Sequence, residues 1–328
     1  MTRYLAVLAA ALLVACSGEK SGSPTGDTGG SVGDDDDDSC GNGVATRFPA
    51  SGDVDVYFRT DVRFGLNTEE TTATIAVADS AGATVNGTTS VAGPLVTWSG
   101  DDLAPNTAYT ATLTYSCGTD QITFTTSATG TATGIDLTGR VYALDLANGD
   151  WVKPPGVGAL LASQLADTQV MVSPTAQSAT DITMTGAIGS AGVQDLCSPT
   201  IAFPPATWSD PSFSLSSDIL PLVVAGFTIE IQNLDLSGAF APDASRIQGA
   251  ALLGTIDTRP LGVAFDLGST DNAVCQLVST FGVSCEECTD GEPYCLSVYI
   301  DAVDAPYLNG TTLVPRSDAD IAADPACQ

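Results

Sequence analysis

Nine cysteines are the residues of this chain whose chemistry depends most on their spacing, and the chain contains no histidine. Without histidine there is neither a Ser-His-Asp nor a Cys-His catalytic arrangement, and no histidine-ligated metal. Cys285 and Cys288 form a C-x-x-C pair, with Cys275 before it and Cys295 after it. This spacing suits a redox-active pair, a zinc site of four thiolates, or structural disulfides.

The sequence around the pair favours structural disulfides over the other two chemistries. A thioredoxin-like pair opens a helix, whereas residues 289–293 read Thr-Asp-Gly-Glu-Pro, which predicts a turn. Glu286 and Glu287 stand between the two cysteines and add negative charge where four thiolates would hold a zinc ion. Structural disulfides need an oxidising compartment, so the choice depends on where the protein resides.

Residues 1–16 read MTRYLAVLAAALLVAC and carry the clearest targeting signal in the chain. Arg3 supplies a positive charge, and the apolar stretch from Leu5 to Val14 is too short to span a bilayer, which needs about 20 residues. The end of the stretch, Leu13-Val14-Ala15-Cys16, resembles the lipobox of bacterial lipoproteins. This resemblance implies that residues 1–15 are a signal peptide and that Cys16 carries a diacylglycerol and, on its amine, a fatty acid such as palmitate.

The lipobox resemblance also implies a partner and a location. Two or three acyl chains on Cys16 would hold the protein firmly to a lipid bilayer. Ser17 follows, where many Gram-negative lipoproteins retained at the inner membrane have Asp, so we expect the outer membrane, at its periplasmic face or at the cell surface. In an exported chain the other eight cysteines are expected to form disulfides. They are Cys40, Cys117, Cys197, Cys275, Cys285, Cys288, Cys295 and Cys327.

Residues 16–39 are predicted to be a flexible tether, because Gly, Ser and Thr dominate and no hydrophobic periodicity appears. Asp34 to Asp38 form a run of five acids that we interpret as a self-repelling spacer, with calcium binding or a surface-export signal as alternatives. The whole chain has 39 acidic and 10 basic residues, a net charge of −29. Such a surface repels phosphate, so no nucleic-acid partner is expected, and no motif predicts a cofactor.

Between residues 54 and 125, short segments alternate apolar and polar side chains with turn residues between them, which predicts a sandwich of two antiparallel sheets. Three of its segments, Phe48–Val56, Leu103–Thr110 and Phe124–Thr126, resemble the bacterial Ig-like domain of the SbsA type, known from S-layer proteins. The resemblance implies an Ig-like domain over residues 40–128. Tyr109 is placed to form a tyrosine corner. A disulfide between Cys40 and Cys117, which the family does not require, would pin the start of the domain.

Residues 129–134 are predicted to be a linker, and residues 135–328 a disulfide-stabilised β-rich domain that resembles no family known to us. Alternation predicts strands over 135–143, 169–172, 181–188 and 296–300 and a long hairpin over 227–256. Helical spacing predicts short helices over 157–165 and 272–281, and four prolines predict a loop over 198–214. The fold class is therefore all-β: an N-terminal Ig-like β-sandwich, then a second antiparallel β domain (barrel or sandwich) with one or two short helices.

These features predict a membrane-anchored envelope lipoprotein with a structural, display or recognition role, an envelope protein or glycan as partner, and no enzymatic activity. One alternative is a carrier that holds a hydrophobic ligand in the C-terminal β domain. Another is a glycan hydrolase that uses two carboxylates. Asp235, Asp257 and Asp266 lie near predicted strand ends, although a solvated acidic face is the simpler interpretation. No catalytic or metal-binding residue is therefore assigned.

Overall fold

The computed structural model describes residues 41–154, 162, 168–224, 227–264 and 267–327. Residues 40–328 form one compact unit. The predicted signal peptide, Cys16, the tether and, apart from one residue, the helix over 157–165 lie outside the described residues. None of the helices in the described part of the chain is long and apolar enough to span a membrane.

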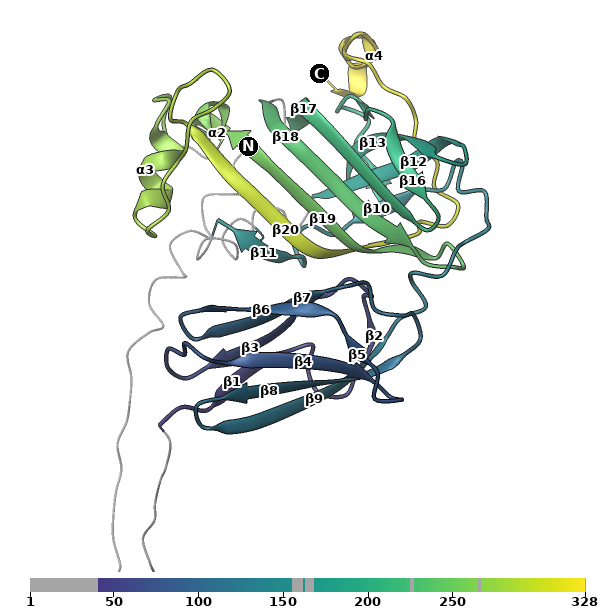
Figure 1. Cartoon of the computed structure of the whole chain (residues 1–328). Helices are drawn as coiled ribbons and strands as arrows, with labels where there is room; N and C mark the ends of the chain where they lie inside the picture. Colours follow the sequence, from purple (N-terminus) through teal and green to yellow (C-terminus); the bar gives the residue numbers. More distant parts are fainter. Residues whose placement is uncertain (1–40, 155–161, 163–167, 225–226, 265–266, 328) are drawn as a thin grey trace, which may run out of the picture. The chain divides into compact units, whose positions relative to one another are not determined.

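The predicted all-β fold class is confirmed, and the first part of the chain is a sandwich of two sheets (Figure 1). One sheet has the order β1 (Val44–Phe48), β3 (Val62–Leu66), β7 (Leu95–Gly100) and β6 (Gly87–Ala92). The other has the order β2 (Asp53–Val56), β9 (Gly118–Thr126), β8 (Ala108–Tyr115), β4 (Thr74–Asp79) and β5 (Thr84–Val85). All pairs are antiparallel except β2 with β9.

The core of the sandwich follows the alternation in the sequence. Val62, Phe64 and Leu66 point inward from β3 and are at most 5% exposed. The hydroxyl of Tyr109 accepts a hydrogen bond from the backbone N–H of Ala104 at 2.8 Å, as the predicted tyrosine corner requires.

The rest of the chain forms one 11-stranded sheet with three described α-helices beside it. β14 (Val193–Gln194) and β15 (Ile201–Ala202) pair with β13 outside the main strand order. The main order is β10 (Tyr142–Leu144), β12 (Gln169–Gln177), β13 (Asp181–Ser190), β16 (Ala206–Ser209), β17 (Ser212–Val224), β18 (Phe227–Phe240), β19 (Arg246–Asp257), β20 (Cys295–Pro306) and β11 (Asp150–Lys153).

This sheet curls strongly but is not a closed barrel. Its first strand, β10, touches the far end of β20: Asp145 N–H donates to Asp304 O at 3.1 Å, and Tyr142 forms an isolated bridge with Tyr307. No continuous ladder joins β10 to β20 among the described residues. The curled sheet surrounds a core centred on Phe240, whose ring is fully buried against Tyr142, Trp208 and Phe213.

The predicted hairpin over 227–256 is confirmed as β18 and β19, and the helix predicted over 272–281 is α3 (Ala273–Ser279). The loop predicted over 198–214 is wrong, because β15, β16 and the start of β17 lie there. Pro204 and Pro205 fall between β15 and β16, and Pro211 falls in the turn before β17, so no proline interrupts a ladder there.

The strand predicted over 135–143 is also wrong for most of its length, since only Tyr142–Leu144 pairs. Gly139 has a φ of +78° and ends any extended run. Leu137 and Val141 are nevertheless buried, so the alternation that suggested a strand reflects inward-facing side chains in an irregular segment.

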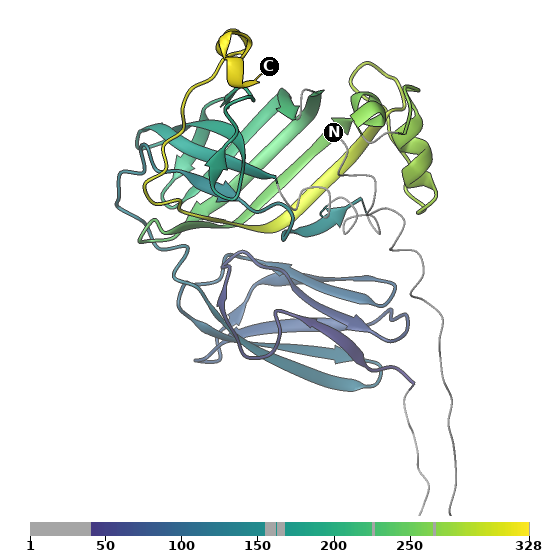
Figure 2. The same cartoon turned by 180° about the vertical axis from the view of Figure 1, so that it is seen from behind.

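The C-terminal segment, residues 307–327, lies along β12 and β13, as the view from behind shows (Figure 2). Leu308 and Leu313 pack on the buried side chains of Met171 and Ala187. Gln194 exchanges hydrogen bonds with the backbone of Val314, and the segment ends in α4 (Asp318–Ala323) and a 3-10 turn over Pro325–Cys327.

Phe240→Ala is expected to lower the free energy of unfolding by about 3–5 kcal/mol, because it leaves a cavity among three aromatic rings. Phe281→Ala is the matched control, since that ring is 52% exposed, and its effect should stay under about 1 kcal/mol. Urea unfolding followed by tryptophan fluorescence measures both. Equal losses in the two variants would contradict the central position of Phe240.

The stability of the sandwich should depend on pH through Glu70, which is only 8% exposed. Its carboxylate accepts hydrogen bonds from the hydroxyl and amide of Ser116 and from the amides of Thr71 and Thr72. These bonds lower its pKa from 4.5 to about 2. A lowered pKa stabilises the fold above the ordinary value, and the gain is lost as the pH falls toward 2.

Glu70→Gln should therefore destabilise the protein at pH 7, and its deficit against wild type should shrink as the pH falls from 4.5 to 2. The exposed neighbour Glu69 supplies the control variant Glu69→Gln. Urea unfolding at a series of pH values gives the comparison, and a deficit that does not change with pH would count against the assignment.

Candidate functional site

The described residues between β19 and β20, from Thr258 to Tyr294, form a cap at one end of the large sheet. The cap contains α2 (Arg259–Ala264), α3 and a cysteine-rich loop. Val274 and Val278 of α3 are buried against Val283 of the loop and Leu296 at the start of β20. This small apolar core packs α3 against the start of β20, and the helix has no side-chain cap and no charge in its terminal turns.

Two disulfides close the cap over short distances in the sequence. Cys275 in α3 is bonded to Cys285, ten residues on, and Cys288 is bonded to Cys295, seven residues on. Cys288 and Cys295 are buried, whereas Cys275 and Cys285 are partly exposed. Between the two disulfides, Glu286 and Cys295 exchange both backbone hydrogen bonds, at 2.8 and 3.0 Å.

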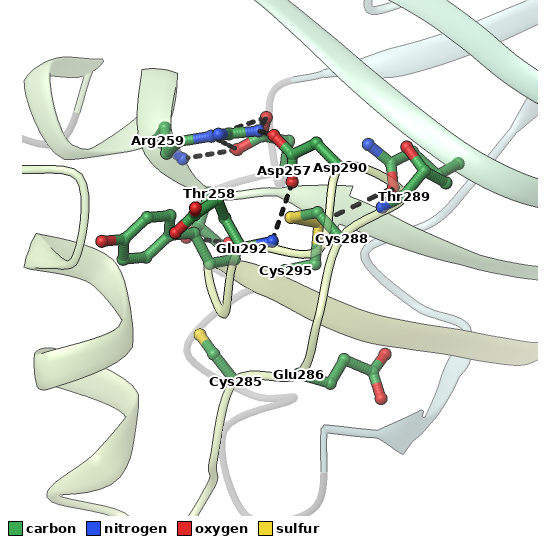
Figure 3. The surroundings of a disulfide bond; sticks show 12 residues. Asp257, Thr258, Arg259, Cys285, Glu286, Cys288, Thr289, Asp290, Glu292 and Cys295 are labelled. Atoms are coloured by element: carbon green, nitrogen blue, oxygen red, sulfur yellow. Dashed lines mark hydrogen bonds and ion pairs between the residues drawn. A yellow bond between two sulfur atoms is a disulfide. The ribbon is translucent and has the colours of Figure 1, made fainter.

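The C-x-x-C pair therefore belongs to two different disulfides. Cys285 and Cys288 are not bonded to each other, as a thioredoxin-like pair would be, and Figure 3 shows Cys288 beside Cys295 with Cys285 set apart. With all four cysteines oxidised, no thiolate is left to bind zinc. The prediction of structural disulfides is confirmed for this cluster.

Arg259 forms the polar centre of the cap, between Asp257 and Asp290 (Figure 3). Its guanidinium donates to both oxygens of Asp257, at 2.6 to 3.0 Å, and pairs with Asp290 at 2.8 Å. These hydrogen bonds, first to Asp257 and then to Asp290, raise the pKa of Arg259. The amide of Glu292 and the Arg259 guanidinium together lower the pKa of Asp290.

Two further contacts fix the cap to the strands beneath it. The buried side chain of Gln232 in β18 accepts a hydrogen bond from the N–H of Thr289 at 2.9 Å. Thr258 donates from its hydroxyl and its N–H to the carbonyl of Tyr294, at 2.6 and 3.0 Å. The cysteine-rich loop is thus held by two disulfides, by the ion pair of Arg259 with Asp290 and by the hydrogen bond to Gln232.

The surface of the cap combines negative charge with exposed apolar side chains. Glu287, Asp290 and Glu292 are exposed on the loop. Val263, Leu267 and Phe281 are 38 to 52% exposed on and beside the helices. The four cysteines of the cap are oxidised and supply no nucleophile.

The remaining predicted cysteines lie away from the cap. Cys197, before β15, is bonded to Cys327 in the C-terminal segment. Arg316 supports this disulfide, because it donates to the carbonyl of Leu196 and pairs with Asp324, both at 2.8 Å. Cys117, after β8, is also disulfide-bonded. Cys40, the predicted partner of Cys117, lies outside the described residues, and so does Cys16.

The carboxylates considered for glycan hydrolysis do not stand free. Asp235 on β18 accepts a hydrogen bond from the Ser216 hydroxyl, and both oxygens of Asp257 are engaged by Arg259. Asp266 lies outside the described residues. Within the part of the chain that the structure describes, no group of three or more Cys, Asp or Glu side chains is arranged to hold a metal ion.

Two surface depressions stand out among the described residues, and both are open to solvent. One lies on the sandwich at the β6 and β7 ends, between Asn86 and Asp101. The other lies beside the start of the large sheet, between Asp136 and Asp210. No residue of the cap lines either depression. Asp210 already accepts three hydrogen bonds from Thr133 and Gly134.

Sequence reasoning identified the cysteines of the cap but missed Arg259 and Gln232. Arg259 could have been found by its rarity, since bases are few in a chain with 39 acids and it lies two residues after Asp257. Gln232 gives no such signal. It sits in a strand like any polar residue, and only the fold shows that it meets Thr289, 57 residues further on.

No protein-family model and no curated protein matches the chain. Among solved structures, CopC from Methylosinus trichosporium OB3b is similar at 18% sequence identity and a TM-score of 0.24, over 26% of this chain and 93% of that one. A TM-score of that size carries no argument for fold or function.

Two of the described disulfides should differ in their effect on stability. Cys197–Cys327 closes a loop of 130 residues and Cys275–Cys285 a loop of 10. Loop-closure entropy then predicts losses of about 5 and about 3 kcal/mol when each pair is replaced by alanine. Urea unfolding of Cys197→Ala/Cys327→Ala and Cys275→Ala/Cys285→Ala tests this order. A larger loss from the shorter loop would show that packing of the cap, rather than chain entropy, dominates.

Proposed function

We propose that the chain is a lipid-anchored protein of the bacterial cell envelope, whose folded residues have a structural, display or recognition role without enzymatic activity. The observation that carries the proposal is the oxidation state of the cysteines. All seven that the structure describes are disulfide-bonded, which fits export to an oxidising compartment. The lipobox-like residues Leu13–Cys16 supply the anchor in this proposal.

In this proposal, acylated Cys16 anchors the chain to the outer membrane, at its periplasmic face or at the cell surface, and residues 16–39 are the tether. Repulsion among the like charges of Asp34–Asp38 would favour an extended tether in this proposal. Ser17 favours the outer membrane, by analogy with sorting of lipoproteins. The surface offered to an envelope protein or glycan would include the rigid cap.

Two observations support recognition over the carrier and hydrolase alternatives. The interior of the large sheet is filled by buried side chains such as Leu215, Leu236 and Ile247, so apolar ligands would have to displace packed residues. The carboxylates Asp235 and Asp257 are each engaged by a neighbouring side chain. Hydrolysis of a glycan by the purified protein, abolished by Asp257→Asn, would overturn the non-enzymatic part of the proposal.

Lipidation is tested by expressing the full chain in a Gram-negative host fed with an alkyne-tagged palmitate. We expect label and membrane association in the wild type, and loss of both in Cys16→Ser. Ser17→Asp is the matched control: it should keep the label but move the protein from the outer to the inner membrane fraction. Label retained by Cys16→Ser would overturn the anchor, and an unlabelled wild type would do the same.

A further inference from the structure

Asp55, in the sandwich strand β2, is bound by two residues of β19 in the large sheet. The guanidinium of Arg246 contacts both carboxylate oxygens of Asp55. The side-chain N–H of Gln248 donates to the backbone carbonyl of the same residue at 2.7 Å. Asp55 has a φ of 67°, a left-handed conformation that costs energy for a residue with a side chain.

Gln248 also connects β19 to the end of the sandwich. Its side-chain oxygen accepts a hydrogen bond from the hydroxyl of Ser127 at 2.7 Å. Gln248 is 5% exposed and Ser127 is 3% exposed, so these bonds are shielded from water. Buried amide bonds of this kind are costly to break, because each partner would be left unpaired.

Close packing at Gly249, the residue after Gln248, adds to these hydrogen bonds. Gly249 has a φ of +58°, and the ring of Tyr57 lies where its side chain would be: a Cβ there would stand 2.2 Å from Cδ1 of Tyr57. Burial raises the pKa of Tyr57 to about 12, as expected for a phenol covered by the sheet. Nearby, Ala239 is fully buried and belongs to the core cluster of the sandwich.

The predicted linker, residues 129–134, is held at both ends. Ser127 N–H donates to Val56 O at 2.8 Å, and Thr133 and Gly134 donate three hydrogen bonds to Asp210 at 2.8 to 3.0 Å. Thr129 is 1% exposed. A flexible connection would leave these backbone groups to water.

We propose that Asp55, Tyr57, Arg246, Gln248 and Gly249 form a latch that locks the sandwich and the large sheet into one rigid body. Residues 129–134 are then a fixed joint instead of a hinge. The strained backbone of Asp55 is held only while the latch is closed, so opening it lets β2 relax. The protein thereby presents its two β regions in one constant orientation.

The contacts of the latch differ in how much they stabilise it, so the latch should respond differently to salt and to substitution. The Arg246–Asp55 pair is partly exposed, with 29% and 50% of the two side chains accessible, so it contributes little and is screened by salt. The buried Gln248 bonds and the Tyr57–Gly249 contact carry the latch. It should therefore stay closed at high ionic strength and open when Gly249 gains a side chain.

Hydrogen–deuterium exchange of the full chain, read by mass spectrometry on peptides covering residues 127–134, tests the proposal. We expect slow exchange in the wild type at both 0.1 and 1 M NaCl, and exchange about tenfold faster or more in Gly249→Ala. Gly139→Ala is the matched control, because Gly139 has a similar φ of +78° but nothing within 4 Å of its Cβ position. It should leave residues 127–134 as slow as in the wild type.

Gln248→Leu keeps the volume of the side chain and removes both hydrogen bonds, so it tests the latch if Gly249→Ala fails to fold. Peptides around Phe240 report whether the large sheet remains intact in each variant. Fast exchange of 127–134 in the wild type would overturn the proposal. So would wild-type protection in a folded Gly249→Ala or, where that variant is unfolded, in Gln248→Leu.

Discussion

The pairing of β18 with β19 is the interaction on which the other parts of the folded unit depend. Phe240 and Ile247, at the turn end of this hairpin, fill the centre of the large core. At the same end, Arg246 and Gln248 reach the sandwich. At the open end, Gln232 holds the loop of the cap. A shift of one residue in register would reverse the faces and break all three connections at once.

The sequence predicted this hairpin because its signal is local. Phe227, Ile229 and Ile231 alternate with polar residues, and the turn follows at Pro242–Ser245. β17 was not predicted, although it pairs along most of β18. Its first half reads Ser-Phe-Ser-Leu-Ser-Ser, in which short polar residues resemble a loop while Phe213 and Leu215 are buried in the core.

The cap shows the same division between local and distant signals. The four cysteines between residues 275 and 295 predicted a loop closed by disulfides. The sequence did not predict which cysteine bonds to which, because the pairing depends on which elements the fold brings together. The contacts between the sandwich and the large sheet could not be predicted from the sequence for a related reason. Asp55 and Arg246 are 191 residues apart, and nothing in either local sequence refers to the other.

The chain has few basic residues, and several of its arginines lie where separate parts of the fold are in contact. Six of the seven arginines among the described residues form an ion pair with aspartate. Arg63 and Arg246 join the sandwich to the large sheet, Arg259 holds the cap and Arg316 the C-terminal segment. In a chain of net charge −29, each of these pairs also relieves repulsion among neighbouring acids.

The bond between Cys197 and Cys327 has a consequence for the order in which the chain is made. Synthesis from the N-terminus presents Cys197 to an oxidant 130 residues before its partner exists, and four other cysteines appear in between. Oxidation in order of emergence would join Cys197 to Cys275. The native bonds therefore require either that Cys197 stays a thiol until Cys327 emerges or that wrong bridges are reshuffled. Only the second route needs thiol–disulfide exchange of the kind that a disulfide isomerase catalyses.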